Sequence, residues 1–300
     1  METQIDQSLD ISINGFLLKA KTWGDKNNKN RILAIHGWLD NANSFDKIAP
    51  LIRDDYYLVA IDLAGHGLSN HREGNGNYYL WDHAVDILNC LDALNWKECT
   101  LIAHSLGSGV ATLVAGSFPN RIQKLIFIDG LGAPFINDEN ETVSSFKTAF
   151  QQLKMAKKTR LYGFANGDAI AFKSKEEAIQ DRMLNRISPI SYQAAAHLID
   201  RGLKPVSGGY RWSHDPKIVL PEHYKMTENQ VRQFIESITC PTLIILGNQG
   251  LFATGLYRSR LVAFRHAEIH WIEGNHHLHL ENSSTQVANL SNIFLEKTNN

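Results

Sequence analysis

Ser105 lies in a sequence context that can turn a hydroxyl into a nucleophile. Residues 101–103 are an apolar run typical of a strand, and the small residues after the serine are typical of a helix start. A sharp strand-to-helix turn pushes the serine hydroxyl clear of the backbone and toward a base. Ala103 and Gly107 meet the need for small flanking residues, with alanine where glycine is usual. The segment predicts a nucleophile elbow, where the free amide of Leu106 stabilises charge on a substrate oxygen.

The elements around this serine must bring its hydroxyl to an edge that a substrate can reach. Residues 31–35 and 57–61 read as buried strands, and each ends in a loop that contains glycine, as the strand before the elbow does. Helical patterns cover residues 45–52, with Asn43 as the expected cap, and residues 81–94. Strands that alternate with helices build a parallel sheet, and ligands gather at the carboxyl ends of its strands.

The loops at the strand ends resemble those of the α/β-hydrolases. The resemblance rests on His-Gly-Trp at residues 36–38, Asp-x-x-Gly-His-Gly at residues 62–67, the elbow, and Gly-Asn-His at residues 274–276. Residues 36–42 and 65–69 are similar to the serine hydrolase-like proteins and related bacterial carboxylesterases. The fold that this resemblance implies is α/β: a mostly parallel central sheet flanked by helices, with a helical lid inserted after the sixth strand.

The same resemblance implies that the base lies in a late loop. The family carries its catalytic histidine in a Gly-x-x-His or Gly-x-His loop, and residues 268–272 read as the strand before that loop. His276 is the better match, His277 stays open because the loop could slip by one residue, and His279 is expected to pack behind the site. Four histidines within ten residues also allow a metal site. Because no second cluster of ligand-type residues accompanies them in the sequence, we expect no metal and no cofactor.

The acid of the expected triad is missing from its usual place. Most α/β-hydrolases carry it after the seventh strand, here residues 241–246, but the position that is normally acidic corresponds to Gly250. Some families of this fold take the acid from the loop after the sixth strand, where Asp129 follows residues 125–128. A carboxylate there can fix the histidine tautomer and stabilise the imidazolium. Asp129 is therefore predicted to be the acid, and the alternative is that it only caps a turn before glycine.

The resemblance implies an oxyanion hole formed by the backbone amides of Trp38 and Leu106. Haloalkane dehalogenases and epoxide hydrolases of this fold attack with an aspartate, whereas Ser105 makes acyl transfer the expected reaction. Ser105 would attack a carbonyl, and His276 would pass the serine proton to the leaving alcohol before water releases the acid. We therefore expect a serine carboxylesterase acting on a small-molecule ester. His104 is expected to pack and hydrogen-bond beneath the elbow.

A long insertion separates Asp129 from the strand at residues 241–246. Its length, about a hundred residues, exceeds an ordinary connection, so residues 133–236 are predicted to form a helical lid on a core of residues 1–132 and 237–300. The expected elements are a helix with an apolar face at Phe146, Phe150 and Leu153, a helix with a capping box at Ser174 and Glu177, a helix opened by Ser188-Pro189, an irregular aromatic stretch at residues 208–216, and a helix after Thr227 and Gln230.

Length and composition agree with one core and a lid. The 300 residues are 43% hydrophobic and carry a net charge of −1, which disfavours a nucleic-acid partner. The N-terminal residues show no secretory pattern, and no apolar run reaches the length of a membrane span. Three cysteines, Cys90, Cys99 and Cys240, form no paired framework. These features predict a cytoplasmic location.

Two other function classes fit the same residues. One is cleavage of a thioester, a lactone or a carbon–carbon bond by the same triad. The other is a catalytically impaired relative that binds a ligand, which the missing acid after the seventh strand makes conceivable. Covalent labelling with a fluorophosphonate distinguishes an activated serine from an inactive one.

Overall fold

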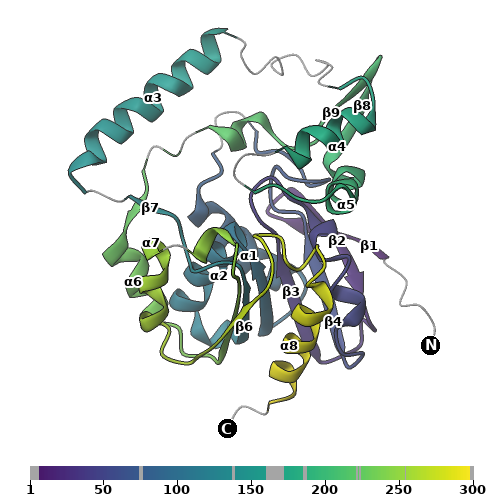
Figure 1. Ribbon diagram of the computed structural model, residues 1–300, viewed down its shortest axis with the longest axis vertical. Helices are drawn as coiled ribbons and strands as arrows, with labels where there is room; N and C mark the ends of the chain where they lie inside the picture. The colour runs from purple at the N-terminus through teal and green to yellow at the C-terminus, as the bar shows by residue number, and fades with distance from the viewer. Residues whose placement is uncertain are drawn as a thin grey trace.

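The computed structural model describes residues 7–73, 77–136, 139–159, 172–184, 188–220, 222, 224–253 and 255–297. Within them, eight strands form one sheet in the order β1-β2-β4-β3-β5-β6-β11-β12 (Figure 1). These strands are β1 (Gln7–Ile13), β2 (Phe16–Trp23), β3 (Asn30–Ile35), β4 (Tyr56–Ile61), β5 (Cys99–His104), β6 (Ile122–Ile128), β11 (Thr242–Gly247) and β12 (Ala267–Ile272). Strand β2 pairs antiparallel with β1 and β4, and all the other pairs are parallel. The predicted mostly parallel sheet is confirmed.

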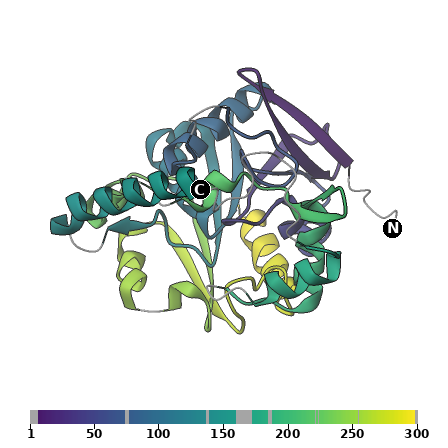
Figure 2. The same ribbon diagram turned by 90° about the horizontal axis from the view of Figure 1, so that it is seen from above.

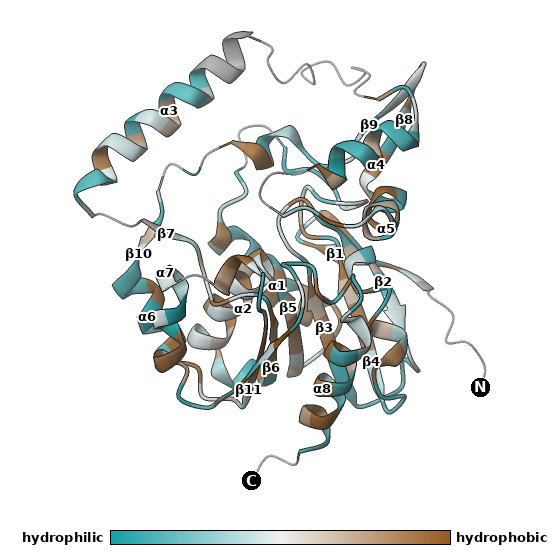
Figure 3. Cartoon of the chain, in the orientation of Figure 1, coloured by the Kyte–Doolittle hydropathy of each residue, from teal (hydrophilic) through white to brown (hydrophobic). Residues whose placement is uncertain are grey.

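The central strands are apolar almost throughout because both faces of the sheet are covered. Every residue of β5 and of β11 is buried, and Figure 3 shows the middle strands in the brown of hydrophobic residues. Along β3, Leu33 and Ile35 face one half of the core, whereas Ile32 and Ala34 face the other. This period of two places alternate side chains on opposite faces.

The helices that cover the sheet are divided between these two faces. Helices α1 (Leu80–Ala93), α2 (Leu106–Ser117) and α6 (Glu228–Glu236) contribute to the first half of the core. Helix α8 (Ser284–Glu296) and the segment after β3 contribute to the second half. The helix predicted over residues 81–94 is therefore confirmed as α1. Helix α6 packs closely on α2, because a Cβ at Gly116 would lie only 2.5 Å from the Phe234 carbonyl oxygen.

The helix predicted over residues 45–52 is wrong in type and in its cap. Two 3₁₀ helices, η1 (Ala42–Phe45) and η2 (Ala49–Leu51), take its place, and Asn41 caps the first by accepting a hydrogen bond from the Asn43 amide. Apolar residues three apart, such as Phe45 and Ile48, face the sheet. A repeat of three suits a 3₁₀ helix better than an α-helix.

The insertion between β6 and β11 contains both helices and short strands. Its elements are β7 (Phe135–Ile136), η4 (Glu139–Glu141), α3 (Thr142–Thr159), α4 (Lys175–Met183), α5 (Tyr192–Gly202), β8 (Leu203–Val206), β9 (Gly209–Trp212), η5 (Pro216–Val219), β10 (Met226–Thr227) and α6. The remaining short elements outside it are η3 (Pro119–Arg121), η6 (Leu251–Ala253), α7 (Gly255–Arg258) and η7 (Ser259–Ala263). Helix α3 projects from the body of the molecule in Figures 1 and 2, and Phe146 and Phe150 are half exposed on it.

Several expectations for the insertion need correction. Helix α5 begins at Tyr192 with Ser191 as its cap, not at Ser188-Pro189. The stretch expected to be irregular contains β9, which pairs with β8 as a hairpin. Only half of the box at Ser174 forms, because the carboxylate of Glu177 accepts from the Lys173 amide instead.

Other expectations for the insertion hold or fall outside what is described. The capping box of Thr227 and Gln230 is complete at the start of α6. The side chain of Leu153, predicted on the apolar face of the first helix, lies outside the described part of the chain.

Helices α4 and α5 are tied to the core by two buried ion pairs. Arg182 Nη2 of α4 lies 3.0 Å from Asp40 Oδ1, and Arg201 Nε of α5 lies 2.7 Å from Asp62 Oδ2. All four side chains are buried. Because removing one member of such a pair leaves a buried charge without compensation, loss of either arginine is expected to destabilise the packing of these helices on the core.

Two predictions about the environment of the chain can be compared with the structure. No helix in the described ranges has the length and apolar character that crossing a bilayer requires. The three cysteines are buried and free.

Candidate active site

Ser105 occupies the turn between β5 and α2. Its backbone has φ 50° and ψ −114°, a conformation that residues other than glycine rarely adopt. Helix α2 starts at the next residue, and a Cβ at Gly107 would collide with the Ile35 carbonyl and lie 2.9 Å from the His36 carbonyl oxygen. Ala103 is fully buried, so its methyl group is accommodated. The local geometry is that of the predicted elbow.

His276 meets the serine from the loop after β12. Its Nε2 lies 2.8 Å from Ser105 Oγ, and its Nδ1 lies 2.5 Å from Asp129 Oδ2. Because a carboxylate accepts, Nδ1 carries the proton and donates to Asp129. The lone pair of Nε2 then points at the Ser105 hydroxyl, which is the arrangement a general base needs.

Asp129 follows β6 and is held from several directions. Its Oδ1 accepts from the Gly247 amide at 3.1 Å, and its Oδ2 accepts from the Leu251 amide at 3.1 Å. Its own amide donates to the Ile245 carbonyl oxygen at 2.8 Å, and its φ of 37° turns the backbone sharply. The side chain is completely buried. These bonds fix the carboxylate beside His276, although Asp129 follows β6 and the histidine follows β12.

The protonation of His276 suits a base. Burial lowers the pKa of His276 below its usual value, and the hydrogen bond to Asp129 opposes this shift without cancelling it. The imidazole is therefore neutral at pH 7. If His276 takes up a proton during a reaction, the carboxylate of Asp129 would stabilise the resulting imidazolium.

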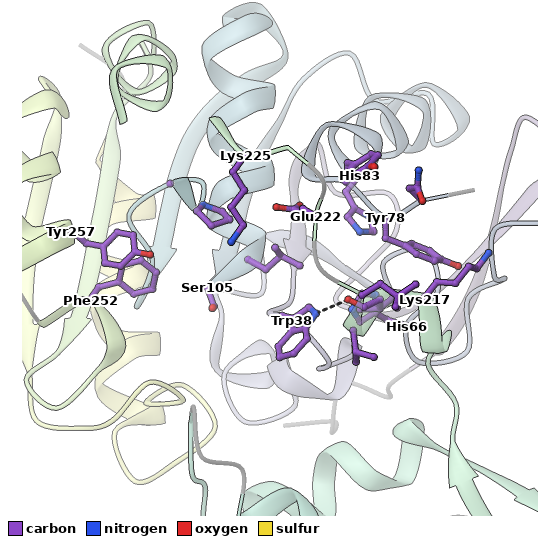
Figure 4. Close-up of a pocket in the computed structure, with 18 residues that line it drawn as sticks. Trp38, His66, Tyr78, His83, Ser105, Lys217, Glu222, Lys225, Phe252 and Tyr257 are labelled. Carbon is purple, nitrogen blue, oxygen red and sulfur yellow. Dashed lines mark hydrogen bonds between the residues drawn. The ribbon is translucent and has the colours of Figure 1, made fainter. Parts of the chain in front are cut away.

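The two residues expected to supply an oxyanion hole lie beside the same cavity as the serine. Trp38 and Leu106 both line the cavity that contains Ser105, and neither amide donates a hydrogen bond to any residue that the structure describes. The indole of Trp38 is held separately, because its Nε1 donates to the Ile218 carbonyl oxygen at 3.3 Å (Figure 4). These amides are the ones that the sequence analysis placed in an oxyanion hole.

The cavity beside Ser105 has a volume of about 500 Å³. In Figure 4, Phe252 and Tyr257 lie on one side of the serine, and Tyr78 and His83 lie on the other. The core supplies Trp38, His66, Asn77, Tyr78, Tyr79, His83, Ser105, Leu106, Gly132, Phe252 and Tyr257, and the insertion supplies Pro134, Lys217, Ile218, Val219, Leu220, Glu222 and Lys225. Such a volume and mostly apolar lining suit a small organic ligand.

The alternative base, His277, faces away from the serine. Its Nε2 lies 3.0 Å from Asp40 Oδ2, whereas His279 Nε2 lies 2.8 Å from Ser44 Oγ. His279 is buried against Phe45, behind the site. The tertiary structure thus separates three histidines that the sequence alone could not distinguish.

One of the four late histidines, His277, belongs to a ligand-type cluster that the spacing of residues in the sequence did not show. Ligand atoms of Asp40, His104 and His277 all lie within 4.8 Å of one another. The sequence analysis missed it because the three residues lie far apart in the chain: Asp40 and His277 lie in two different loops, and His104 is the last residue of β5. Arg182 Nη2 lies 3.0 Å from Asp40 Oδ1 and 3.3 Å from His277 Nε2, so a guanidinium already provides positive charge there. Asp40 was visible in the motif at residues 36–42, whereas no local pattern pointed to Arg182.

Comparison with known proteins finds relatives that match nearly the whole chain. The model of a family described as alpha/beta hydrolase fold matches residues 30–283. A serine hydrolase-like protein of Dictyostelium discoideum is 30% identical over 96% of this chain and 82% of its own length. A serine hydrolase-like protein of Mus musculus is 29% identical over 97% of this chain and 96% of its own length.

Solved structures with a similar fold also match nearly the whole chain. A hypothetical protein from Pseudomonas aeruginosa is 33% identical, with a TM-score of 0.88 over 97% of this chain and 100% of that chain. The thioesterase domain from the curacin biosynthetic pathway is 23% identical, with a TM-score of 0.80 over 98% of this chain and 100% of that chain, and at this identity it supports the fold alone.

Proposed function

The chain belongs to the alpha/beta hydrolase family, and from this premise we propose that it is a serine hydrolase that cleaves carboxylic esters through an acyl-enzyme intermediate. The proposal rests on one observation, the unbroken chain of contacts from Ser105 Oγ through the His276 ring to the Asp129 carboxylate. In it, Ser105 is the nucleophile, His276 the general base and acid, and Asp129 the acid of the triad.

The proposed reaction has two stages, formation and hydrolysis of the acyl-enzyme. Ser105 Oγ attacks the ester carbonyl carbon while His276 Nε2 takes the hydroxyl proton, and Asp129 stabilises the imidazolium. The amides of Trp38 and Leu106 bind the oxyanion. When the tetrahedral intermediate collapses, Nε2–H protonates the leaving alkoxide and the acyl-enzyme remains. Water, deprotonated by His276, then attacks the acyl carbon, so that the acid leaves and Ser105 recovers its proton.

We propose further that residues 133–236 form a lid on the core of residues 1–132 and 237–300. The support is that seven residues from Pro134 to Lys225 line the cavity together with core residues. The insertion thereby shapes the space in which the acyl group or the alcohol of a small ester would lie. A cytoplasmic location is the matching proposal for a chain with three free, buried cysteines.

Labelling by a fluorophosphonate tests whether the serine is activated. We expect the protein to be labelled at Ser105 and to hydrolyse p-nitrophenyl esters, with a rate that depends on acyl length because the cavity has a limited volume. Ser105→Ala should show neither labelling nor hydrolysis at an unchanged melting temperature. If the folded protein is not labelled, it is a ligand-binding relative and the proposal is wrong.

A parallel panel of thioesters and lactones tests the bond that is cleaved. Preference for oxygen esters by kcat/KM supports the carboxylesterase assignment. A much higher kcat/KM for thioesters or lactones, with the same dependence on Ser105, would keep the triad but replace the substrate class.

A further inference from the structure

Asp40 is a buried charge at which four parts of the molecule meet. It lies in the loop that carries Trp38, two residues before η1, and is only 2% exposed. Its Oδ1 accepts from Arg182 Nη2 of α4 at 3.0 Å. Its Oδ2 accepts from His277 Nε2 at 3.0 Å. The carboxylate therefore joins three segments: the loop that carries Trp38, here called the oxyanion loop, the insertion, and the loop that carries the proposed base.

The fourth part is the strand end before the nucleophile. His104 Nδ1 lies 3.6 Å from Asp40 Oδ2, and His104 Nε2 donates to the His276 carbonyl oxygen at 3.0 Å. The packing here is tight, because a Cβ at Gly37 would lie 2.8 Å from His104 Nδ1 and 3.1 Å from Asp40 Oδ2. A shift of the Asp40 carboxylate would consequently displace the neighbours of Trp38, Ser105 and His276 together.

We propose that Asp40 is a positioning residue that holds the oxyanion loop, the elbow and the base loop in mutual register, and that Arg182 makes this register depend on the insertion. The inference rests on the proposed function and extends it beyond the triad. Asp40 acts through His104, His277 and the backbone and touches no reacting atom. Since displacements of about 1 Å in a catalytic site can cost about a hundredfold in rate, such support has a measurable effect.

The charge of Asp40 also reaches the proposed base. Burial tends to raise the pKa of Asp40, but His277, His104 and Arg182 outweigh it and hold that pKa well below the usual range, so the carboxylate stays ionised. The groups that influence the pKa of His276 are Asp129, His104 and Asp40, and the Asp40 charge raises it. His277, beside it, has its pKa lowered to about 4 by burial and is neutral. Removing the Asp40 charge should therefore lower the pKa of His276.

Asp40→Asn tests both effects in the full-length protein. We expect kcat for a p-nitrophenyl ester to fall about tenfold to a hundredfold, with KM within about twofold. The acid limb of kcat/KM should move to lower pH, because a neutral side chain no longer favours the imidazolium. A mere loss of stability would not move that limb. Unchanged kcat and an unchanged limb in the folded variant would overturn the inference.

Arg182 and Arg201 provide a matched pair of variants. Each comes from the insertion and forms a buried ion pair with a core aspartate, but only the partner of Arg182 contacts His277 and His104. We expect Arg182→Met to lower kcat about tenfold, Arg182→Lys to restore most of it, and Arg201→Met to leave kcat within about twofold at a similar loss of melting temperature. Equal effects of Arg182→Met and Arg201→Met on kcat would contradict the inference. This comparison does not need Asp40→Asn, so it remains decisive if that variant fails to fold.

The two proposals fail in different ways. If the wild-type protein is not labelled by a fluorophosphonate, the proposed function is wrong. If it is labelled at Ser105 and turns over esters, but the Asp40 and Arg182 variants keep its kcat and pH profile, only the positioning role is wrong.

Discussion

The carboxylate of Asp129 fills the space that a side chain at Gly250 would need. A Cβ at Gly250 would lie 2.5 Å from Asp129 Oδ2 and closer still to Oδ1. Asp129 follows β6 and Gly250 follows β11, and these neighbouring parallel strands bring both loops to the same edge of the sheet. The absence of a side chain at residue 250 thus makes room for the Asp129 carboxylate, and His276 is paired with a carboxylate that follows β6 instead of β11.

Asp129→Asn is expected to reduce kcat by about 10⁴-fold, as loss of the acid does in serine triads. An amide can donate to His276 Nδ1 and so favours the tautomer in which Nε2 carries the proton and can no longer accept from Ser105. Steady-state kinetics on a p-nitrophenyl ester measures this, with the melting temperature as the control for folding. A rate near that of the wild type would reduce Asp129 to a turn residue and leave a Ser105–His276 dyad.

Gly250→Ala is expected to lower both the melting temperature and kcat, because the new methyl group collides with the Asp129 carboxylate. In the Asp129→Gly background the same substitution should cost little, so the two changes should be strongly non-additive. A double-mutant cycle on melting temperature measures the coupling. Additive effects would mean that the two positions do not share one space.

An acid exchanged between these positions should keep part of the activity. Asp129→Gly combined with Gly250→Asp returns a carboxylate to the neighbouring strand end, and we expect kcat at least tenfold above that of Asp129→Gly alone. The comparison needs only the two variants and one ester. No recovery in a folded double variant would show that the carboxylate cannot reach His276 from residue 250.

The acid limb of kcat/KM should lie below pH 6.5, the usual pKa of a histidine. Burial lowers the pKa of His276, so the neutral ring that accepts the Ser105 proton persists to lower pH. A pH–rate profile with a stable ester measures the limb. A limb above pH 6.5 would require that the negative charge of Asp129 outweighs burial.

The folded state should lose stability as the pH falls below about 6.5. Burial lowers the pKa of His83 to about 3 and of His277 to about 4, and it lowers those of His66 and His279 strongly. Between the lowered pKa of each histidine and the usual 6.5, the unfolded chain binds a proton at that histidine and the folded chain does not. Each such histidine lowers the free energy of unfolding by about 1.4 kcal/mol per pH unit in that window. Burial raises the pKa of Asp86 to about 6, so the folded chain takes up a proton there, and this partly offsets the effect of one histidine.

Urea unfolding at pH 7, 6 and 5 measures this loss. His83→Gln should make the slope of stability against pH shallower by about the contribution of one histidine. A slope that His83→Gln does not alter would exclude His83 as one of the titrating groups.

Local sequence was sufficient wherever neighbours in the chain determine the structure. The apolar runs predicted the central strands, and the small residues around Ser105 predicted its strained turn, because that turn leaves room for little else. The capping box of Thr227 and Gln230 was equally readable. By contrast, the two 3₁₀ helices at residues 42–51 and the hairpin of β8 and β9 depend on what they pack against, which local preferences do not contain.

By itself the sequence determined the mostly parallel sheet and the family to which the chain belongs, together with a short set of candidate residues. Only the tertiary structure decided that His276 and not His277 faces Ser105, that Asp129 fills the place left by Gly250, and that Asp40 meets Arg182. The reason is physical: backbone preferences and hydrophobic patterns act over a few residues, whereas contacts between distant residues follow from the order of strands in the sheet and the packing of the insertion on it.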